Sequence, residues 1–155
     1  MTRQKLFRIL VAVSRFGLVV LFLFTAGAKI AIIKTFASNV GELLSAARIN
    51  YQRWMWPATI AVIAFEILAA LMLLVPKTVR LGAAVAGLML IGFSGFALYY
   101  VYVLHGEPLE CGCFGGIIAS QLGVKTALRN LALLIPVLLV LVGYRKRASA
   151  QAITV

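Results

Sequence analysis

The chain has 155 residues, of which 63% are hydrophobic and only 12% are charged, so it carries more apolar surface than a soluble domain of this size can bury. Its net charge is +11, but the basic residues are interspersed between apolar stretches rather than gathered along one groove, which argues against nucleic-acid binding. Its 4 acidic residues cannot neutralise 15 basic ones, so anionic lipid headgroups are the expected counter-charge. The composition therefore predicts an integral membrane protein in a lipid bilayer.

Four stretches are long and apolar enough to cross a bilayer as helices, which takes roughly 20 residues each. They cover about residues 9–28, 57–75, 81–104 and 126–144. Backbone groups inside lipid must be hydrogen-bonded internally, and runs of this length are too long for the strands of a barrel. The sequence predicts an all-α integral membrane protein, a four-transmembrane-helix bundle in which residues 1–155 form a single membrane domain.

Basic residues near the ends of the spans set the expected orientation, because short cytoplasmic segments carry an excess of Lys and Arg. One side of the predicted bundle gathers Arg3, Lys5, Arg8, Lys77, Arg80, Arg145, Lys146 and Arg147. We therefore expect both termini to be cytoplasmic, in a bacterial-type inner membrane. The two longer loops, residues 29–56 and 105–125, then face the periplasm or the cell exterior.

The first outer loop carries a helical pattern of apolar residues. Offsets of four, three, one and three positions place on one helix face the side chains of Phe36, Val40, Leu43, Leu44 and Ala47. We expect a short amphipathic helix here, lying on the membrane surface or capping the bundle. Docking of a partner protein on this helix is the functional alternative.

Single ionisable residues interrupt the first two spans, namely Arg15 and Glu66. Charges inside a membrane are costly and usually face the bundle interior. At 1.5 Å per residue the two lie roughly 9 Å and 15 Å from the same membrane face, a gap that an arginine side chain can close. Two interpretations stay open: an ion pair that locks two helices together, or a proton or quinone site. Arg129 and Asn130 open the fourth span, where a cation could stabilise a thiolate or bind an anionic headgroup.

The second outer loop contains both cysteines of the chain, in the motif Cys111-Gly112-Cys113. A redox cysteine must be reachable and able to form a thiolate, and a loop at the membrane surface allows both. Gly112 gives the backbone the freedom to bring the two cysteines into disulfide range. The small ring closed by such a bridge would be strained and therefore prone to exchange.

Three interpretations of the cysteine pair stay open: a reversible redox disulfide, a structural or incidental pair, and a metal site. The metal alternative combines His105 with Cys111 and Cys113, near the carboxylates of Glu107 and Glu110. Zinc sites usually need a second ligand pair, which is missing from this motif, whereas two thiolates suit copper.

These motifs together resemble those of the MauE branch of the DoxX-like membrane proteins. The resemblance runs over about residues 8–143 and rests on Cys111-Gly112-Cys113-Phe114-Gly115, Arg129-Asn130, Glu66, Arg15, Gly27 and Lys29. It implies a four-helix bundle similar in layout to the membrane enzymes that make disulfides with quinone as electron acceptor. Quinone is thereby the candidate cofactor. MauE itself is linked to the maturation of methylamine dehydrogenase, a disulfide-rich enzyme, alongside a thioredoxin-like partner.

Carried over to this chain, the resemblance implies that Cys111 and Cys113 are the catalytic pair of a thiol–disulfide oxidoreductase. The pair would exchange with a thioredoxin-like or other thiol partner outside the membrane. The quinone-coupled enzymes have a second cysteine pair, so here either one pair passes electrons directly to quinone or another protein completes the relay. The alternatives are an accessory subunit of a larger membrane complex with no chemistry of its own, and a metal-binding or transport protein.

Overall fold

The computed structural model describes residues 3–103 and 124–152, with side chains described as far as Tyr144, and this part of the chain contains helices and no strand. The helices are α1 (Arg3–Ala31), α2 (Ile33–Ala46), α3 (Tyr51–Leu74), α4 (Val79–Tyr102), α5 (Val124–Ala132) and α6 (Leu134–Ala152). Four segments are long and apolar enough to span a membrane: α1, α3, α4 and the stretch Val124–Tyr144 that joins α5 to α6. The predicted all-α membrane protein with four spans is confirmed.

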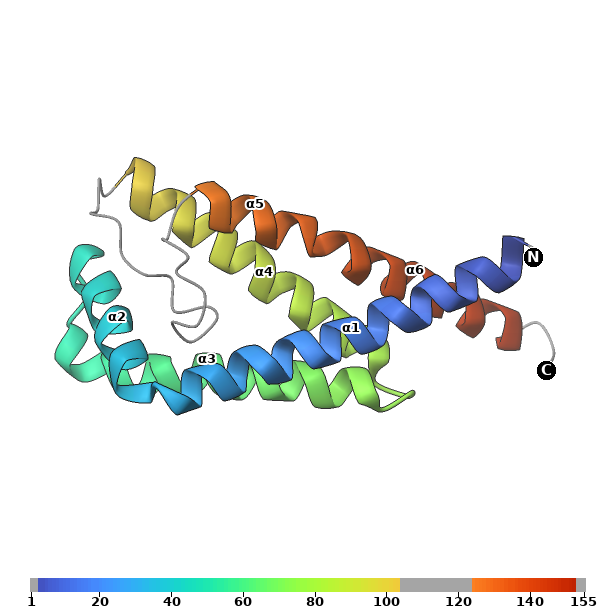
Figure 1. Ribbon diagram of the computed structural model, residues 1–155, viewed down its shortest axis with the longest axis horizontal. Coiled ribbons are helices and arrows are strands. Elements are labelled where there is room, and N and C mark those ends of the chain that lie inside the picture. Colours follow the sequence, from blue (N-terminus) through green and yellow to red (C-terminus); the bar gives the residue numbers. More distant parts are fainter. Residues whose placement is uncertain (1–2, 104–123, 153–155) are drawn as a thin grey trace.

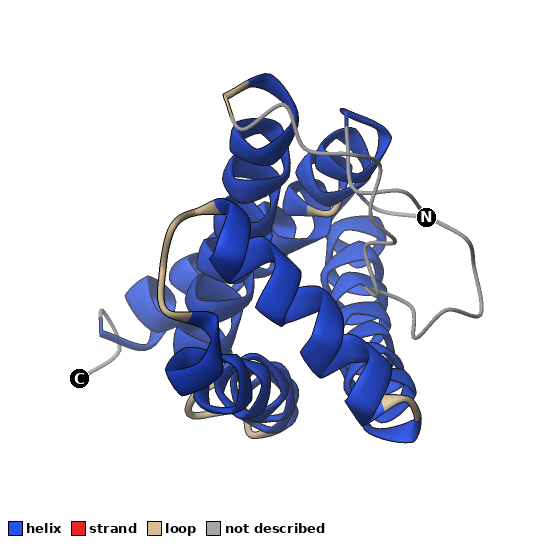
Figure 2. Ribbon diagram, turned by 90° about the vertical axis from the view of Figure 1, so that its left-hand side faces the viewer, coloured by secondary structure: helices blue, strands red, loops and turns tan. Residues whose placement is uncertain are grey.

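The spans are arranged in a ring in which each packs on two neighbours (Figure 1). α1 packs on α3, α3 on α4, α4 on both α5 and α6, and α6 back on α1. The start of α1 and the end of α6 lie at one end of the bundle, and α2 lies at the opposite end, which we call the α2 end. Figure 2 views the molecule from the α2 end, where α2 packs on α3.

Apolar side chains occupy both the interior and the outer surface of the ring. The core joins α1, α3, α4 and α6 through residues that include Leu18, Leu73, Val79, Ala83, Ala86, Val137 and Val140. On the outside, large side chains such as Val20, Leu88 and Leu128 are about two-thirds exposed. A surface of this kind is suited to lipid, as expected for a multi-pass membrane protein.

Several helices differ from their hydropathy-based ranges, and two of these differences have a reason in the local sequence. α3 begins at Tyr51 rather than near residue 57, because the side chain of Asn50 caps it by accepting a hydrogen bond from the Arg53 N–H at 3.3 Å. The fourth span is interrupted at Leu133, between α5 and α6. Pro136 explains this break, because it has no N–H to donate to the carbonyl of Ala132 and its ring crowds that carbonyl.

A tight contact between helix backbones lies where α4 leaves the turn that follows α3. A Cβ atom added to Gly82 would stand 2.8 Å from the Leu73 backbone nitrogen and 2.8 Å from the Met72 Cβ. The Leu73 contact is with backbone, which cannot rotate away as the end of a flexible side chain could. The close approach of α3 and α4 therefore requires glycine at position 82.

We expect the Gly82→Ala substitution to lower the free energy of unfolding by about 1–3 kcal/mol, because it overpacks this contact. Unfolding in detergent micelles, followed by circular dichroism, measures the change. Gly92→Ala is the matched control on α4, since nothing lies within 4 Å of its added Cβ. The control should leave stability unchanged or raise it slightly, because alanine favours helix more than glycine does. Equal stability of the two variants would contradict the tight contact.

Candidate functional site

A salt bridge between α1 and α3 is buried inside the bundle. Lys29 Nζ donates a hydrogen bond to Glu66 Oε1 at 2.6 Å, and both residues are only 3% exposed. The ammonium of Lys29 also lies 5.5 Å from the centroid of the Phe36 ring, within the range of a cation–π interaction. Neither charge would be tolerated at this depth without the other, because taking a single charge out of water costs several kcal/mol.

Helical periodicity brings the two charged residues to the interior. Lys29 continues the buried face of α1 that carries Leu18, Phe22 and Thr25, at offsets of four, three and four residues. Glu66 lies between Ile63 and Ala70 on the buried face of α3 in the same way. The ion pair thus occupies positions at which each helix would otherwise bury an apolar side chain.

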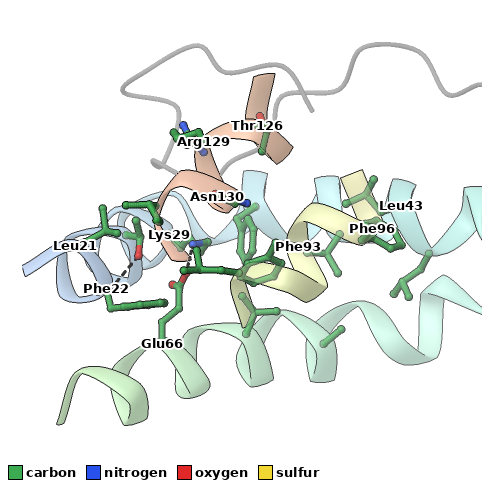
Figure 3. Close-up of a pocket in the computed structure, with 18 residues that line it drawn as sticks. Leu21, Phe22, Lys29, Leu43, Glu66, Phe93, Phe96, Thr126, Arg129 and Asn130 are labelled. Carbon is green, nitrogen blue, oxygen red and sulfur yellow. Dashed lines mark hydrogen bonds and ion pairs between the residues drawn. The ribbon is translucent and has the colours of Figure 1, made fainter. Parts of the chain in front are cut away.

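A cavity of about 310 Å³ lies beside this ion pair. Its walls are formed by Leu21, Phe22, Thr25, Lys29, Phe36, Val40, Leu43, Leu44, Ala58, Val62, Glu66, Leu90, Phe93, Phe96, Thr126, Arg129, Asn130 and Leu133. Figure 3 shows Lys29 and Glu66 meeting between α1 and α3, with α5 and its side chains Thr126, Arg129 and Asn130 across the cavity from α3. Segments from every part of the described chain except α6 thus converge on one space.

The lining combines aromatic and aliphatic walls with a few polar groups. Four phenylalanines face the cavity, and the polar side chains come from α1, α3 and α5. Small-molecule sites in proteins are typically of this size and composition, with a few polar groups fixing the orientation of an otherwise apolar ligand. The arrangement is suited to a lipid-soluble, ring-sized molecule that presents polar atoms toward the ion pair.

Three of the four candidate residues for a quinone or proton site line this cavity, namely Glu66, Arg129 and Asn130. The fourth, Arg15, does not. The structure does not bring Arg15 and Glu66 together, so the ion pair between them, one of the two interpretations drawn from the sequence, is wrong. Glu66 is instead paired with Lys29.

Arg15 caps the end of α3 nearer the termini. Its guanidinium donates to the carbonyl of Leu73 at 2.6 Å, to the carbonyl of Leu74, and to the Tyr144 hydroxyl at 2.7 Å. The last carbonyls of a helix have no partner within that helix and carry partial negative charge, so they attract a cation. Arg15 thereby ties α1 to α3 and α6, which is a structural role.

Lys29 is one of the residues on which the family resemblance rests, but the sequence does not reveal its role at this site. The hydropathy-based first span ends at Ala28, which puts Lys29 at the start of the first outer loop. α1 runs on to Ala31. The helical spacing of Lys29 from Phe22 and Thr25 predicts that it faces the interior, and a carboxylate such as Glu66 inside a membrane requires a cation as its partner. Cys111, Cys113 and His105 lie outside the described residues.

Residues 7–143 match the family model of the methylamine utilisation protein MauE. Comparison with curated proteins and with solved structures gives no match. The matched range covers most of the chain and includes the ion pair, every residue that lines the cavity, and the Cys111-Gly112-Cys113 motif.

We expect Glu66→Leu to lower the free energy of unfolding by about 3–5 kcal/mol, because it leaves the ammonium of Lys29 buried without a counter-charge. The double substitution Lys29→Met with Glu66→Leu removes both charges and should recover most of that loss. Thermal unfolding in detergent of the parent, the single variant and the double variant measures the difference. A single variant as stable as the double variant would contradict the pairing.

Proposed function

This chain belongs to the MauE family, and we propose that it is a membrane thiol–disulfide exchange protein of that type. In this proposal Cys111 and Cys113 are the redox pair, and a thioredoxin-like or other thiol protein is the partner. Exchange takes place on the extracytoplasmic face of a bacterial-type inner membrane, with a membrane quinone in the cavity as electron acceptor. The observation that carries the proposal is that α5, the helix that follows the cysteine motif in the chain, forms one wall of the cavity.

Chain connectivity supports a link between the cysteines and the cavity. The Cys111-Gly112-Cys113 motif belongs to the segment that joins α4 to α5. The end of α4 and the start of α5, which flank this segment, both lie toward the α2 end of the bundle (Figure 1). Part of the cavity wall is formed by α2 and by the last turns of α1 before it. A dithiol in that segment and an acceptor in the cavity would share this end of the protein.

The exchange step moves two electrons and two protons from the partner to the cysteine pair. A thiolate of the reduced partner attacks the Cys111–Cys113 disulfide, and a mixed disulfide forms. The second thiol of the partner then resolves this bond, which leaves the partner oxidised and Cys111 and Cys113 as a dithiol. Transfer of two electrons and two protons to quinone closes the disulfide again and yields hydroquinone. One cysteine pair is sufficient for this cycle.

The residues around the cavity have roles in the proposed second half of the cycle. The phenylalanine walls exclude water and hold an apolar ring. Lys29 gives one N–H to Glu66 and, as an ammonium with three donors, can give another to a quinone carbonyl. Asn130 offers both a donor and an acceptor from the opposite wall. These groups bind and orient the acceptor, while the electrons come from the cysteines.

We expect Cys111 and Cys113 to be bridged in membranes isolated under oxidising conditions and open after mild reductant. Mass spectrometry after alkylation distinguishes the two states by the labels added. The Cys111→Ser/Cys113→Ser variant should abolish disulfide formation in the partner protein while leaving the bundle folded. A cysteine pair that responds to neither oxidant nor reductant would contradict the proposal. Continued oxidation of the partner in the serine variant would instead identify the chain as an accessory subunit.

The membrane side of the exchange is tested separately. In intact spheroplasts, a membrane-impermeant maleimide should label the reduced Cys111 and Cys113, because the basic residues near the termini predict that their loop is outside. A single cysteine placed at Lys77 in the serine variant is the control and should be labelled only after lysis. The reverse labelling pattern would refute the extracytoplasmic assignment.

A further inference from the structure

One oxygen of the buried carboxylate has no hydrogen-bond partner among the described residues. Glu66 accepts from Lys29 through Oε1, whereas its Oε2 is buried and unpaired. Folded proteins rarely leave a buried polar atom without a partner, because its lost hydration is then not replaced. The Thr25 hydroxyl is also a neighbour of Glu66, but it donates its hydrogen to the carbonyl of Phe22 at 3.1 Å. A donor that is not part of the described chain is therefore expected at Oε2.

The cavity beside Glu66 has room for a donor much larger than water. Its volume of about 310 Å³ is roughly twice that of the ~150 Å³ cavity that binds benzene in an engineered protein. The rings of Phe22, Phe93 and Phe96 line it. Aromatic walls of this kind favour a flat ring, through stacked or edge-to-face packing.

The chemistry of the unpaired atom restricts the oxidation state of such a ring. As the carboxylate partner of Lys29, Glu66 can only accept hydrogen bonds. A quinone carries two carbonyl acceptors and has no donor for Oε2. A hydroquinone carries two hydroxyl groups, either of which can donate to it. The Glu66 carboxylate should therefore distinguish the reduced ring from the oxidised one.

We propose that the cavity binds a ring of the hydroquinone class, with one ring hydroxyl donating to Glu66 Oε2, and that it binds the corresponding quinone more weakly. The identity of the ring rests on the proposed function, but its binding does not depend on the cysteines. A tenfold preference for the reduced form raises the midpoint potential of the bound two-electron couple by about 30 mV. Such a shift favours the flow of electrons from a dithiol to the bound quinone.

The test measures the affinity of the full chain, carrying Cys111→Ser and Cys113→Ser, for a decyl-substituted benzohydroquinone and for its quinone. The serine substitutions prevent electron exchange between probe and protein. Titration is carried out in lipid nanodiscs without oxygen and followed by calorimetry. Because hydrogen bonds to charged groups are strong, we expect the hydroquinone to bind at least about tenfold more tightly. Equal affinities, tighter binding of the quinone, or no binding of either ring would overturn the proposal.

Removal of the ion pair should abolish the preference. In the serine background, Lys29→Met with Glu66→Leu takes away the acceptor without leaving a buried charge. We expect this variant to bind both rings with affinities that differ by less than about twofold. Persistence of the hydroquinone preference in this variant would assign the preference to another group and refute the role of Glu66.

A second pair of variants locates the bound ring without changing any charge. Val62 lines the cavity, and Val62→Phe should fill part of it and reduce the affinity for both rings at least about tenfold. Ile60, on the same helix, is 58% exposed and does not line the cavity, so Ile60→Phe is the matched control and should bind like the parent. Unchanged binding in the Val62 variant would place the ring elsewhere and overturn the proposal.

The outcomes separate this inference from the proposed function. Cysteines that never cycle, together with a clear hydroquinone preference, would refute thiol exchange and leave the binding site in place. Cysteines that cycle, together with equal binding of the two rings, would refute only the selectivity assigned to Glu66 and leave thiol exchange in place.

Discussion

The buried salt bridge between Lys29 and Glu66 constrains the half of the bundle nearer α2. Because neither charge is tolerated alone in an apolar interior, the two helices that carry them are held in one rotation and one relative height. Lys29 lies in the last turn of α1, so the same constraint fixes where α2 starts. At the opposite end, Arg15 binds the final carbonyls of α3. The two cations of α1 that face α3 thus hold these helices together at two levels.

Much of the fold could be predicted from the sequence, because a long uncharged run has few alternatives to a membrane-spanning helix. Glu66 could also be recognised, since a carboxylate in such a run must face the interior. Its partner could not be identified from depth alone. Arg15 lies level with the carbonyls of Leu73 and Leu74, to which it donates, and these residues are about two helical turns from Glu66 along α3. Both Arg15 and Lys29 face α3, and their positions along the helix axis decide which of them meets the carboxylate. Helix ends read from hydropathy are uncertain by several residues, so depths estimated from them could not resolve this.

The cavity could not be predicted from the sequence either, but for a different reason. Its walls come from five helices, and its existence depends on how α2 folds back onto α3. The pattern of Phe36, Val40, Leu43 and Leu44 predicted a shared helix face, and in the structure these four residues line the cavity together. Periodicity can identify such a face, but the surface opposite it is set by tertiary packing. In the same way, Arg129 and Asn130 could be recognised as polar residues at the start of a span, whereas their position across from Glu66 depends on the packing of α5 against α4.

A neutral pair of opposite charges gives the cavity a property that a single charge would not. The ammonium of Lys29 provides donors and the carboxylate of Glu66 provides an acceptor within one hydrogen-bond length of each other, with no net charge between them. A neutral, lipid-soluble ring can therefore approach without leaving an uncompensated charge in its apolar surroundings. Carbonyl oxygens on the ring can accept from Lys29, and hydroxyl groups can donate to Glu66. Both oxidation states of one ring then have a partner in the same site, and the unpaired oxygen of Glu66 determines which of them is bound more tightly.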